Sequence, residues 1–317
     1  MVAAVNSQVS LLDCMFRENF AGSKGGAIAS FNRAIMFLSN SNFTENGANS
    51  GGVLYASDIT NQTFTNCILS VNIAGVRGGA LYLSASAQVY FTHSKAKFNR
   101  ADTAPGGAFF VQDDSYINMS YSEFNNNKGT EGGALYLITN EDAIISNCLF
   151  INNVATTSGG AITLGASSKS VWYDSWCIHN IVIESGGCIA IADTGTATFQ
   201  NFTMTDNYAH TGGAIALGGY SHAVITQSDI RGNSAYHGGG VVSAQNSFLT
   251  LHDSVLRNNT ALASGGGAVL SSGDVVEQVY FLNNTANKGG GIVVTYAKDL
   301  VAEIFHCHFE YVLESHK

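Results

Sequence analysis

Basic residues and proline are scarce in this 317-residue chain. It holds 14 Lys and Arg against 23 Asp and Glu, which gives a formal charge of −9, and only 12% of its residues are charged. A surface that follows nucleic-acid phosphates needs clustered basic residues, whereas here they are scattered singly, so we expect no nucleic-acid partner. The single proline, Pro105, argues against a collagen-like or proline-rich linker segment.

Long apolar runs are also missing. Gly, Asn and Ser recur every few positions, so no stretch approaches the roughly 18 uninterrupted apolar residues of a membrane-spanning helix. The first residues, Met-Val-Ala-Ala-Val-Asn, lack the basic start and apolar core of a secretory signal. With 45% apolar residues, the composition still supplies ample material for a buried core. We expect a soluble chain without a membrane span.

Gly-Gly pairs recur through the whole chain at a nearly constant interval. The mean spacing is (289 − 25)/10 = 26.4 residues, and the pairs begin at positions 25, 51, 78, 106, 132, 159, 186, 212, 238, 265 and 289. Eleven copies without a linker predict a single domain over 1–317. Since the chain begins and stops within a repeat, we expect this domain to be a segment of a longer protein.

Each repeat has the same internal order. An apolar residue is followed three positions later by Asn, and then by Gly-Gly, a small residue and a short apolar run. Phe150 and Asn153, for example, lead to Gly159-Gly160-Ala161-Ile162. Short apolar runs bounded by Gly and Asn are typical of strands, and no 3.6-residue periodicity indicates helices. We therefore predict an all-β fold, a parallel β-helix or solenoid of about eleven coils with roughly 26 residues per coil.

Stacked coils would bring equivalent positions into columns. The residue three before the Asn is apolar in most repeats, as at Phe16 and Phe43, and predicts an inward stack. Two residues earlier stands a small residue, mostly Ser or Cys, which shares that strand face and also points inward. The Asn column predicts a ladder at a turn, in which side-chain amides bond the backbone or the amide of the next coil. Its members are Asn19, Asn46, Asn72, Asn99, Asn127, Asn153, Asn180, Asn207, Asn233, Asn259 and Asn284.

The cysteines do not suggest a disulfide scaffold. Four of the six fall in the small inward column: Cys14, Cys67, Cys148 and Cys307. The closest two are two coils apart, about 9.6 Å, which exceeds the roughly 7 Å limit between bridged Cα atoms. We therefore predict six free thiols. A disulfide between Cys177 and Cys188, which lie in one coil in different columns, is the alternative.

The alternation of Gly-Gly-Ala-Ile/Leu/Val and Phe-x-x-Asn motifs resembles the repeats of the polymorphic outer membrane proteins of chlamydiae. Similar repeats occur in large surface proteins of protists and other microbes. The resemblance covers essentially the whole chain, because the two motifs alternate in a fixed order eleven times. It implies a right-handed parallel β-helix of the pectin-lyase-like type that serves as the ectodomain of a surface adhesin.

One outward column is aromatic in four consecutive coils. It follows the inward apolar residue of the Gly-Gly strands, so its side chains are expected to point outward. Its aromatic members are Tyr55, Tyr82, Phe110 and Tyr136. Exposed, this stripe would bind glycan rings or a protein partner. The alternative is stacking that stabilises the solenoid, under a covering segment.

Acidic residues follow the Gly-Gly strands by similar offsets, which predicts that they share one corner of the solenoid. They are Asp113, Asp114, Glu141, Asp142 and Asp193. Polysaccharide lyases and hydrolases need converging carboxylates, so one interpretation is an acidic groove for a sugar or a cation. The other is a solvated turn, where Asp is common. No Arg or Lys stands at the matching positions, which argues against a lyase.

The histidines do not form a metal-binding pattern. His210 and His237 precede Gly-Gly pairs in adjacent coils, and His306 and His308 alternate on one strand. Zinc needs three or four converging ligands, and no third residue is evident. We expect surface histidines and neither a metal nor a cofactor.

Six Asn-x-Ser/Thr sequences occur, a number close to the chance expectation. They begin at Asn42, Asn61, Asn118, Asn201, Asn258 and Asn283. In a secreted eukaryotic protein, Asn61 and Asn118 are expected to be the acceptors of N-glycans, because they lie outside the Phe-x-x-Asn core.

These features predict a non-catalytic β-helix that is extracellular or exposed on a cell surface. We expect it to act in adhesion or as a structural segment of a larger assembly. Its partners would be other chains of that assembly, the surface of a host or neighbouring cell, or glycans. The alternative is a polysaccharide-active enzyme, a lyase or hydrolase, that uses the acidic corner.

Overall fold

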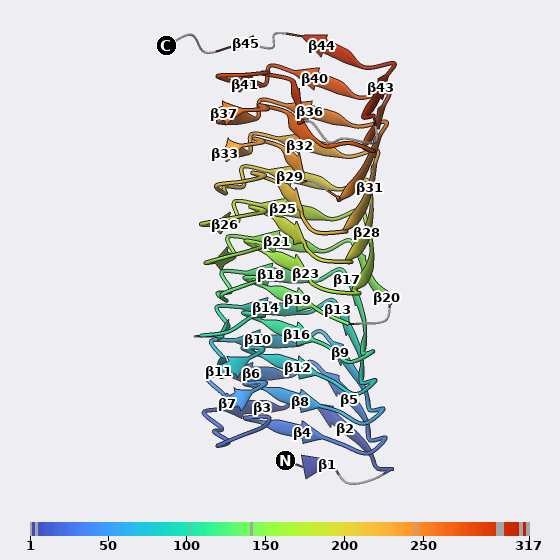
Figure 1. Ribbon diagram of the computed structural model, residues 1–317. Coiled ribbons are helices and arrows are strands. Elements are labelled where there is room, and N and C mark those ends of the chain that lie inside the picture. Colours follow the sequence, from blue (N-terminus) through green and yellow to red (C-terminus); the bar gives the residue numbers. More distant parts are fainter. Residues whose placement is uncertain are drawn as a thin grey trace.

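The structure is a computed structural model that describes residues 2–3, 6–101, 103–139, 142–244, 246–295, 301–310 and 313–314. These residues form a rod of stacked β-coils (Figure 1). All strand pairs are parallel, and paired residues of adjacent coils are 24 to 28 positions apart. The predicted all-β parallel solenoid of about eleven turns is confirmed. None of the described segments is a helix that could cross a membrane.

Three sheets of twelve strands run along the rod, and each coil adds one strand to each of them. Sheet A comprises β1 (Val2–Ala3), β4 (Ile28–Ser30), β8 (Leu54–Ala56), β12 (Leu81–Leu83), β16 (Phe109–Val111), β19 (Leu135–Leu137), β23 (Ile162–Leu164), β27 (Ile189–Ile191), β30 (Ile215–Leu217), β34 (Val241–Ser243), β38 (Ala268–Leu270) and β42 (Ile292–Val294). Sheet B comprises β2 (Gln8–Leu12), β5 (Ile35–Ser39), β9 (Asn61–Thr65), β13 (Gln88–Thr92), β17 (Tyr116–Ser120), β20 (Asp142–Ser146), β24 (Lys169–Tyr173), β28 (Thr196–Gln200), β31 (His222–Thr226), β35 (Phe248–His252), β39 (Val275–Glu277) and β43 (Glu303–Phe305).

Sheet C follows sheet B in every coil. It comprises β3 (Met15–Arg17), β6 (Asn42–Thr44), β10 (Ile68–Ser70), β14 (Lys95–Lys97), β18 (Glu123–Asn125), β21 (Leu149–Ile151), β25 (Trp176–Ile178), β29 (Thr203–Thr205), β32 (Asp229–Arg231), β36 (Val255–Arg257), β40 (Tyr280–Leu282) and β44 (His308–Glu310). A fourth face, D, lies between sheet C and the Gly-Gly pair and is interrupted. Its strands are β7 (Gly47–Ser50), β11 (Ile73–Arg77), β15 (Arg100–Ala101), β22 (Val154–Ala155), β26 (Ile181–Val182), β33 (Ser234–His237), β37 (Thr260–Ser264), β41 (Thr285–Ala286) and β45 (Leu313–Glu314).

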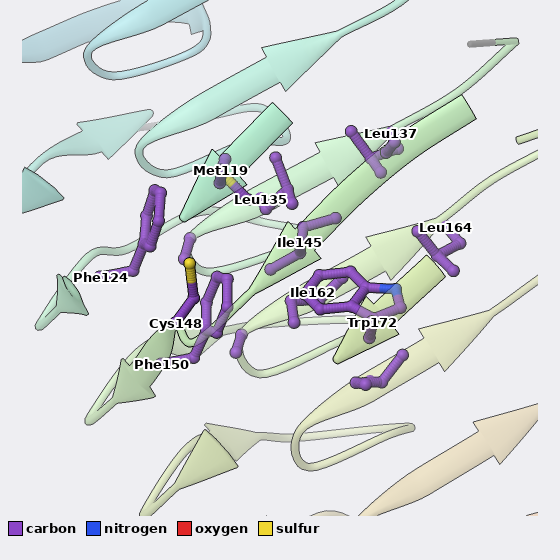
Figure 2. Packing of buried hydrophobic residues seen from close by; sticks show 14 of the residues in the cluster. Met119, Phe124, Leu135, Leu137, Ile145, Cys148, Phe150, Ile162, Leu164 and Trp172 are labelled. Carbon is purple, nitrogen blue, oxygen red and sulfur yellow. The ribbon is translucent and has the colours of Figure 1, made fainter. Parts of the chain in front are cut away.

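Apolar side chains from sheets A, B and C fill the interior of the rod. Figure 2 shows Phe150 of sheet C near Ile162 of sheet A and Trp172 of sheet B, with Phe124 of sheet C one coil earlier. The rings of Phe124 and Phe150 stack with centroids 4.8 Å apart. The predicted inward apolar column is therefore confirmed, and identical neighbours stack because parallel strands pair in register.

Single residues in the left-handed region turn the chain at two corners of each coil. In the coil of β21, Asn147 precedes the strand with φ of 51° and Asn152 follows it with φ of 54°. Asn and Asp tolerate this conformation better than other residues that carry a Cβ. The residue before each ladder Asn thus takes the left-handed turn, and the ladder Asn itself does not.

The asparagine ladder is present and buried. Asn153 donates from Nδ2 to the side-chain oxygen of Asn180 at 3.0 Å and to the carbonyl of Phe124 at 2.9 Å. Its own Oδ1 accepts bonds from the backbone and side chain of Asn127. The same pattern continues from coil to coil, so the ladder satisfies backbone groups at the corner between sheet C and face D.

The small inward column forms a second ladder. Ser122 Oγ donates to the carbonyl of Ser120 and accepts the backbone N–H of Ser94 in the preceding coil. In the next coil, Cys148 Sγ likewise donates to the carbonyl of Ser146. Ser and Cys fit this column because each is small enough for the interior and can donate to the backbone.

Cys177 and Cys188 form a disulfide, with Cα atoms 6.0 Å apart. The prediction of six free thiols is therefore wrong for these two residues. Cys177 takes the inward apolar position of β25, and Cys188 takes the small position after Gly-Gly in the same coil, so both side chains enter the same layer of the core. The other four cysteines are free. Burial raises the pKa of Cys148 to about 12, which keeps its thiol protonated and unreactive.

Candidate functional site

The four predicted aromatic residues stack along the outer side of sheet A. Centroid distances are 4.9 Å for Tyr55 and Tyr82, 5.4 Å for Tyr82 and Phe110, and 5.2 Å for Phe110 and Tyr136. The ring planes are within 8° of parallel. The rings form a cluster separate from the main core, as expected for side chains on the opposite face of the sheet.

The expectation that this stripe is exposed is wrong. Tyr55, Tyr82 and Phe110 are only 7%, 8% and 2% exposed, and Tyr136 is half-buried. The Gly-Gly corner turns the chain sharply from face D to sheet A, so residues just before the corner reach across the outward rings. The stripe is therefore largely a covered stack, and the interpretation as a stabilising element fits three of its four members.

Two cations form part of this cover. Lys24 Nζ lies 4.3 Å from the centroid of the Tyr55 ring, and the Arg77 guanidinium carbon lies 5.0 Å from that of Phe110. Arg77 also donates to Gln112 Oε1 at 3.2 Å, which ties face D to the far side of the stack. Both contacts are cation–π interactions, which stabilise most where water is excluded.

Tyr136 ends the stack in a more polar setting. Burial, reinforced by nearby Glu131, raises the pKa of Tyr136 to about 12. Burial also raises the pKa of Glu131, while its hydrogen bond with Tyr136 lowers it. The pair is a donor hydroxyl and an acceptor carboxylate, which satisfy each other at the rim of the stack.

The predicted acidic corner does not converge. Asp113 and Asp114 both have φ of 55° and form the central pair of a turn in which Ser115 N–H bonds the Gln112 carbonyl. This is a type I′ turn, which favours Asn, Asp and Gly. Asp193 occupies the same turn three coils further along, about 14 Å away. Turn conformation explains these exposed carboxylates. Glu141 lies outside the described residues.

Asp142 lies elsewhere, at the first residue of β20. Its register partner on β24 is Lys169, and the same outward column continues with Thr196 and His222. These four residues line a shallow depression of about 250 Å³ on sheet B. Sequence reasoning placed no cation beside the acidic residues, and the register shows that Lys169 is adjacent to Asp142. A carboxylate, an ammonium and an imidazole thus share one depression.

The histidines in the described ranges lie near the surface as predicted. His210 stacks on Tyr236 at 5.0 Å, and His237 Nδ1 lies 2.8 Å from Ser264 Oγ. His306 and His308 belong to the corner before β44 and to β44 itself. Within the described ranges, no three His, Cys, Asp or Glu side chains gather as metal ligands.

The structure sorts the six glycosylation sequences by exposure. Three of the asparagines lie in strands and are half-buried: Asn42, Asn61 and Asn118. Three occupy exposed left-handed turns: Asn201, Asn258 and Asn283. Accessibility therefore favours Asn201, Asn258 and Asn283 as acceptors of N-glycans. This reverses the preference for Asn61 and Asn118 that was based on the position of the motif.

An exposed apolar surface escaped the sequence analysis. Five large apolar side chains, between 36% and 68% exposed, gather on sheet C and face D around β25, β22 and β26: Val154, Trp176, Ile181, Ile183 and Tyr208. We call this set the C/D apolar face. Its sequence signal was available, because Trp176 and Ile178 flank the inward Cys177 and must point outward.

Comparison with known proteins identifies a family. The family model described as right-handed β-helix region matches residues 2–203 and 197–303. No curated protein and no solved structure matches the chain. Since the matched residues cover almost the whole sequence and agree with the coils of the structure, the chain belongs to the right-handed β-helix family.

Proposed function

We propose that this chain is a non-catalytic segment of an extracellular or cell-surface protein, which acts in adhesion or in the structure of a larger assembly. The observation that carries the proposal is the regular rod, in which three sheets keep their register through successive coils. Such a rod presents equivalent side-chain positions about every 4.8 Å. It therefore suits repeated weak contacts that add up along one surface.

Two further observations support an extracellular location. The Cys177–Cys188 disulfide is typical of proteins that fold in an oxidising compartment. The repeat motifs resemble those of chlamydial polymorphic outer membrane proteins, which are surface proteins. That specific likeness stays a prediction, because the matching family model is broader.

The location and the function are tested on the source cells. An antibody raised against the folded rod should label intact cells, and added protease should remove that label without cell lysis. Beads coated with the purified rod should bind the partner surface, and beads coated with the reduced, denatured chain should not. Recovery of the protein only from the cytoplasm, with Cys177 and Cys188 reduced, would contradict the proposal.

A polysaccharide-active enzyme is the second candidate, and the depression on sheet B favours it. Asp142 offers a base and its register neighbour Lys169 a cation in one hollow, and His222 lines the same hollow three strands further along. The test is incubation with neutral and acidic polysaccharides, followed by assay of new reducing ends and unsaturated sugars. Activity that Asp142→Asn abolishes and Asp113→Asn preserves would support an enzyme. Absence of cleavage across the panel would remove this candidate.

A further inference from the structure

A groove follows the corner between sheets B and C. At this corner one residue in the left-handed region is followed by an inward residue and then by the first, outward residue of sheet C. In the coil of β18 these are Tyr121, with φ of 50°, the buried Ser122, and Glu123. Because the small serine turns into the core, the side chains on either side of it leave a trough between them. We call the trough between the corner residues and the first residues of sheet C the B/C groove.

Two hollows lie in the B/C groove. The first has a volume of about 340 Å³, and its lining includes Tyr121, Glu123 and Asn147. The second has a volume of about 420 Å³, and its lining includes Asp253, Gln278 and Tyr280. Each hollow thus combines an aromatic ring, a side-chain amide and a carboxylate. Six coils separate β18 from β40, so the hollows are about 29 Å apart along the rod.

The aromatic ring of each hollow is exposed and supported from behind. Tyr121 is 59% exposed and stacks on His93 with ring centroids 5.0 Å apart. His93 is itself held by Thr92, whose Oγ1 lies 3.0 Å from its Nδ1. Tyr280 is 52% exposed, and its ring lies 5.7 Å from that of His308. A supported ring loses little freedom on binding, and it suits the apolar C–H face of a sugar ring.

The polar groups beside the rings have hydrogen-bonding capacity left. Among the described residues, neither the Asn147 nor the Gln278 side-chain amide has a partner. Glu123 accepts from Asn125 Nδ2 at 2.9 Å and pairs with Lys95 at 3.0 Å. These contacts, Asn125 foremost, lower the pKa of Glu123, so it stays an ionised acceptor. A carboxylate offers about four lone-pair sites, and sugar hydroxyls donate to such groups.

The backbone beside the first hollow has its N–H groups in use. Tyr121 donates to the carbonyl of Ser146 at 3.1 Å, and Glu123 to that of Ser94 at 3.0 Å. Asn147 donates to the carbonyl of Tyr173 at 3.1 Å. An extended peptide that adds to a sheet is held mainly by main-chain hydrogen bonds. The groove therefore favours a polymer that side chains recognise.

The charges of the groove favour an uncharged polymer. Among the described residues that line the two hollows, Lys95 is the only Lys or Arg, and it is paired with Glu123. The second hollow contributes Asp253, and the whole chain has a formal charge of −9. A polysaccharide that carries carboxylates or sulfates is repelled by such a surface.

We propose that the B/C groove binds a neutral polysaccharide chain, with one sugar-binding hollow at Tyr121 and a second at Tyr280. This inference rests on the surface role proposed above and names a ligand class for it. A polysaccharide that reaches both hollows makes two weak contacts at once, and the second contact adds strongly to the affinity because it forms within the same complex.

Affinity electrophoresis tests the ligand class. The full chain is run in native gels that contain glucomannan, xyloglucan, laminarin or, as the acidic comparison, polygalacturonate. We expect at least one of the three neutral polysaccharides to retard the wild type. Tyr121→Ala combined with Tyr280→Ala should weaken this binding by about 100-fold or more, since both contacts are lost.

The matched control changes two tyrosines outside the groove. Tyr208 and Tyr220 are 52% and 69% exposed, and Tyr208→Ala with Tyr220→Ala should be retarded like the wild type. All three proteins should have the same circular dichroism. The proposal is overturned if none of the neutral polysaccharides retards the wild type, if the Tyr121 and Tyr280 changes leave the retardation intact, or if polygalacturonate retards it most.

Calorimetry counts the hollows. The probe is a tetrasaccharide cut from the polysaccharide that retards the wild type, because it is too short to reach both sites. We expect two equivalents per wild-type chain, one for Tyr121→Ala, one for Tyr280→Ala, and none for the double variant. A single equivalent per wild-type chain overturns the second hollow.

The cell-surface labelling described above is independent of these measurements. A rod that labels intact cells and binds no neutral polysaccharide removes this inference and keeps the proposed location. A rod that binds the polysaccharide through Tyr121 and Tyr280 but is recovered only from the cytoplasm keeps this inference and removes the location.

Discussion

Asn153 donates its side-chain amide to the side-chain oxygen of Asn180 at 3.0 Å, one coil further along the rod. The same Asn153 accepts the backbone N–H of Asn127, so its removal leaves buried donors and a carbonyl without partners. We expect Asn153→Ala to lower the free energy of unfolding by about 3 kcal/mol or more, since buried polar groups that lose partners cost about 1–3 kcal/mol each. Urea denaturation measures this change.

The neighbouring Asn152→Gly is the control for this variant. Asn152 is exposed and has φ of 54°, a conformation that glycine adopts without strain. Its substitution should leave the free energy of unfolding within about 0.5 kcal/mol of wild type. Equal losses from both substitutions would show that the ladder contributes nothing specific.

The covered aromatic stack should contribute to stability. Phe110 is 2% exposed and lies between Tyr82 and Tyr136, with Arg77 over its ring. Phe110→Ala removes these contacts, and we expect a loss of about 3 kcal/mol, at the lower end for buried aromatic residues. Tyr90→Ala, on the exposed face of sheet B, should cost far less. A change of under 1 kcal/mol at Phe110 would reopen its role as an accessible binding residue.

The sequence predicted the repeating features of the fold well, because each column is written eleven times. The asparagine ladder and the stack of Phe124 and Phe150 follow directly from spacing and strand alternation. The burial of Tyr82 and Phe110 does not follow from spacing. It depends on the angle of the chain at the Gly-Gly corner and on the position of the Arg77 side chain over the rings. The alternation of side chains along a strand predicts the face of the sheet on which a residue lies. It does not predict whether another segment covers that face.

The candidate site was harder to predict for the same reason. Asp113 stands seven residues after the start of its Gly-Gly pair and Asp142 stands ten, so one occupies a type I′ turn and the other begins a strand beside Lys169. Four residues separate the sheet A strand from the sheet B strand in both coils, so the position of the carboxylate relative to this corner decides which face it joins. The exposure of Trp176 was not predicted, although Trp176 and Ile178 flank the inward Cys177 and therefore point outward.

The disulfide predicts a definite thiol count. Cys177 and Cys188 are joined, and the other four cysteines are free. Protein produced under oxidising conditions should show four reactive thiols in denaturant without reductant and six after reduction. Ellman titration or mass spectrometry after alkylation checks this, and six thiols without reductant would show that the bond is absent.

Ile59 carries backbone strain that a single substitution should relieve. It has φ of 61°, which a β-branched residue rarely adopts, and its side chain is 58% exposed. Left-handed backbone costs an ordinary residue roughly 1–2 kcal/mol, and asparagine tolerates it better. Ile59→Asn should therefore raise the free energy of unfolding by about 1 kcal/mol, measured by denaturant titration. Ile59→Val keeps the branch and should bring no gain; equal gains from both would show that strain is not the cause.

Asp274 makes stability depend on pH near the carboxy-terminal coils. Its carboxylate is buried and accepts bonds from the backbone of Leu249 at 2.8 Å and of Ser271 at 2.7 Å. Burial raises the pKa of this group to about 6, although these hydrogen bonds oppose the shift. An unfolded Asp has a pKa of about 3.9, so the folded chain holds the proton more tightly. The contribution of Asp274 is therefore fully present below about pH 4 and is lost as pH rises through about 6.

The variant Asp274→Asn isolates this contribution, because the amide mimics the protonated acid in size and lacks its titration. We expect wild type and variant to have similar stability at pH 4. At pH 7 the wild type should be less stable than the variant, by on the order of 3 kcal/mol, since each pKa unit corresponds to about 1.36 kcal/mol. Urea denaturation of both proteins between pH 4 and 7 gives the difference directly, which cancels the effects of the other carboxylates. A difference that stays constant with pH would show that Asp274 does not change its protonation state over this range.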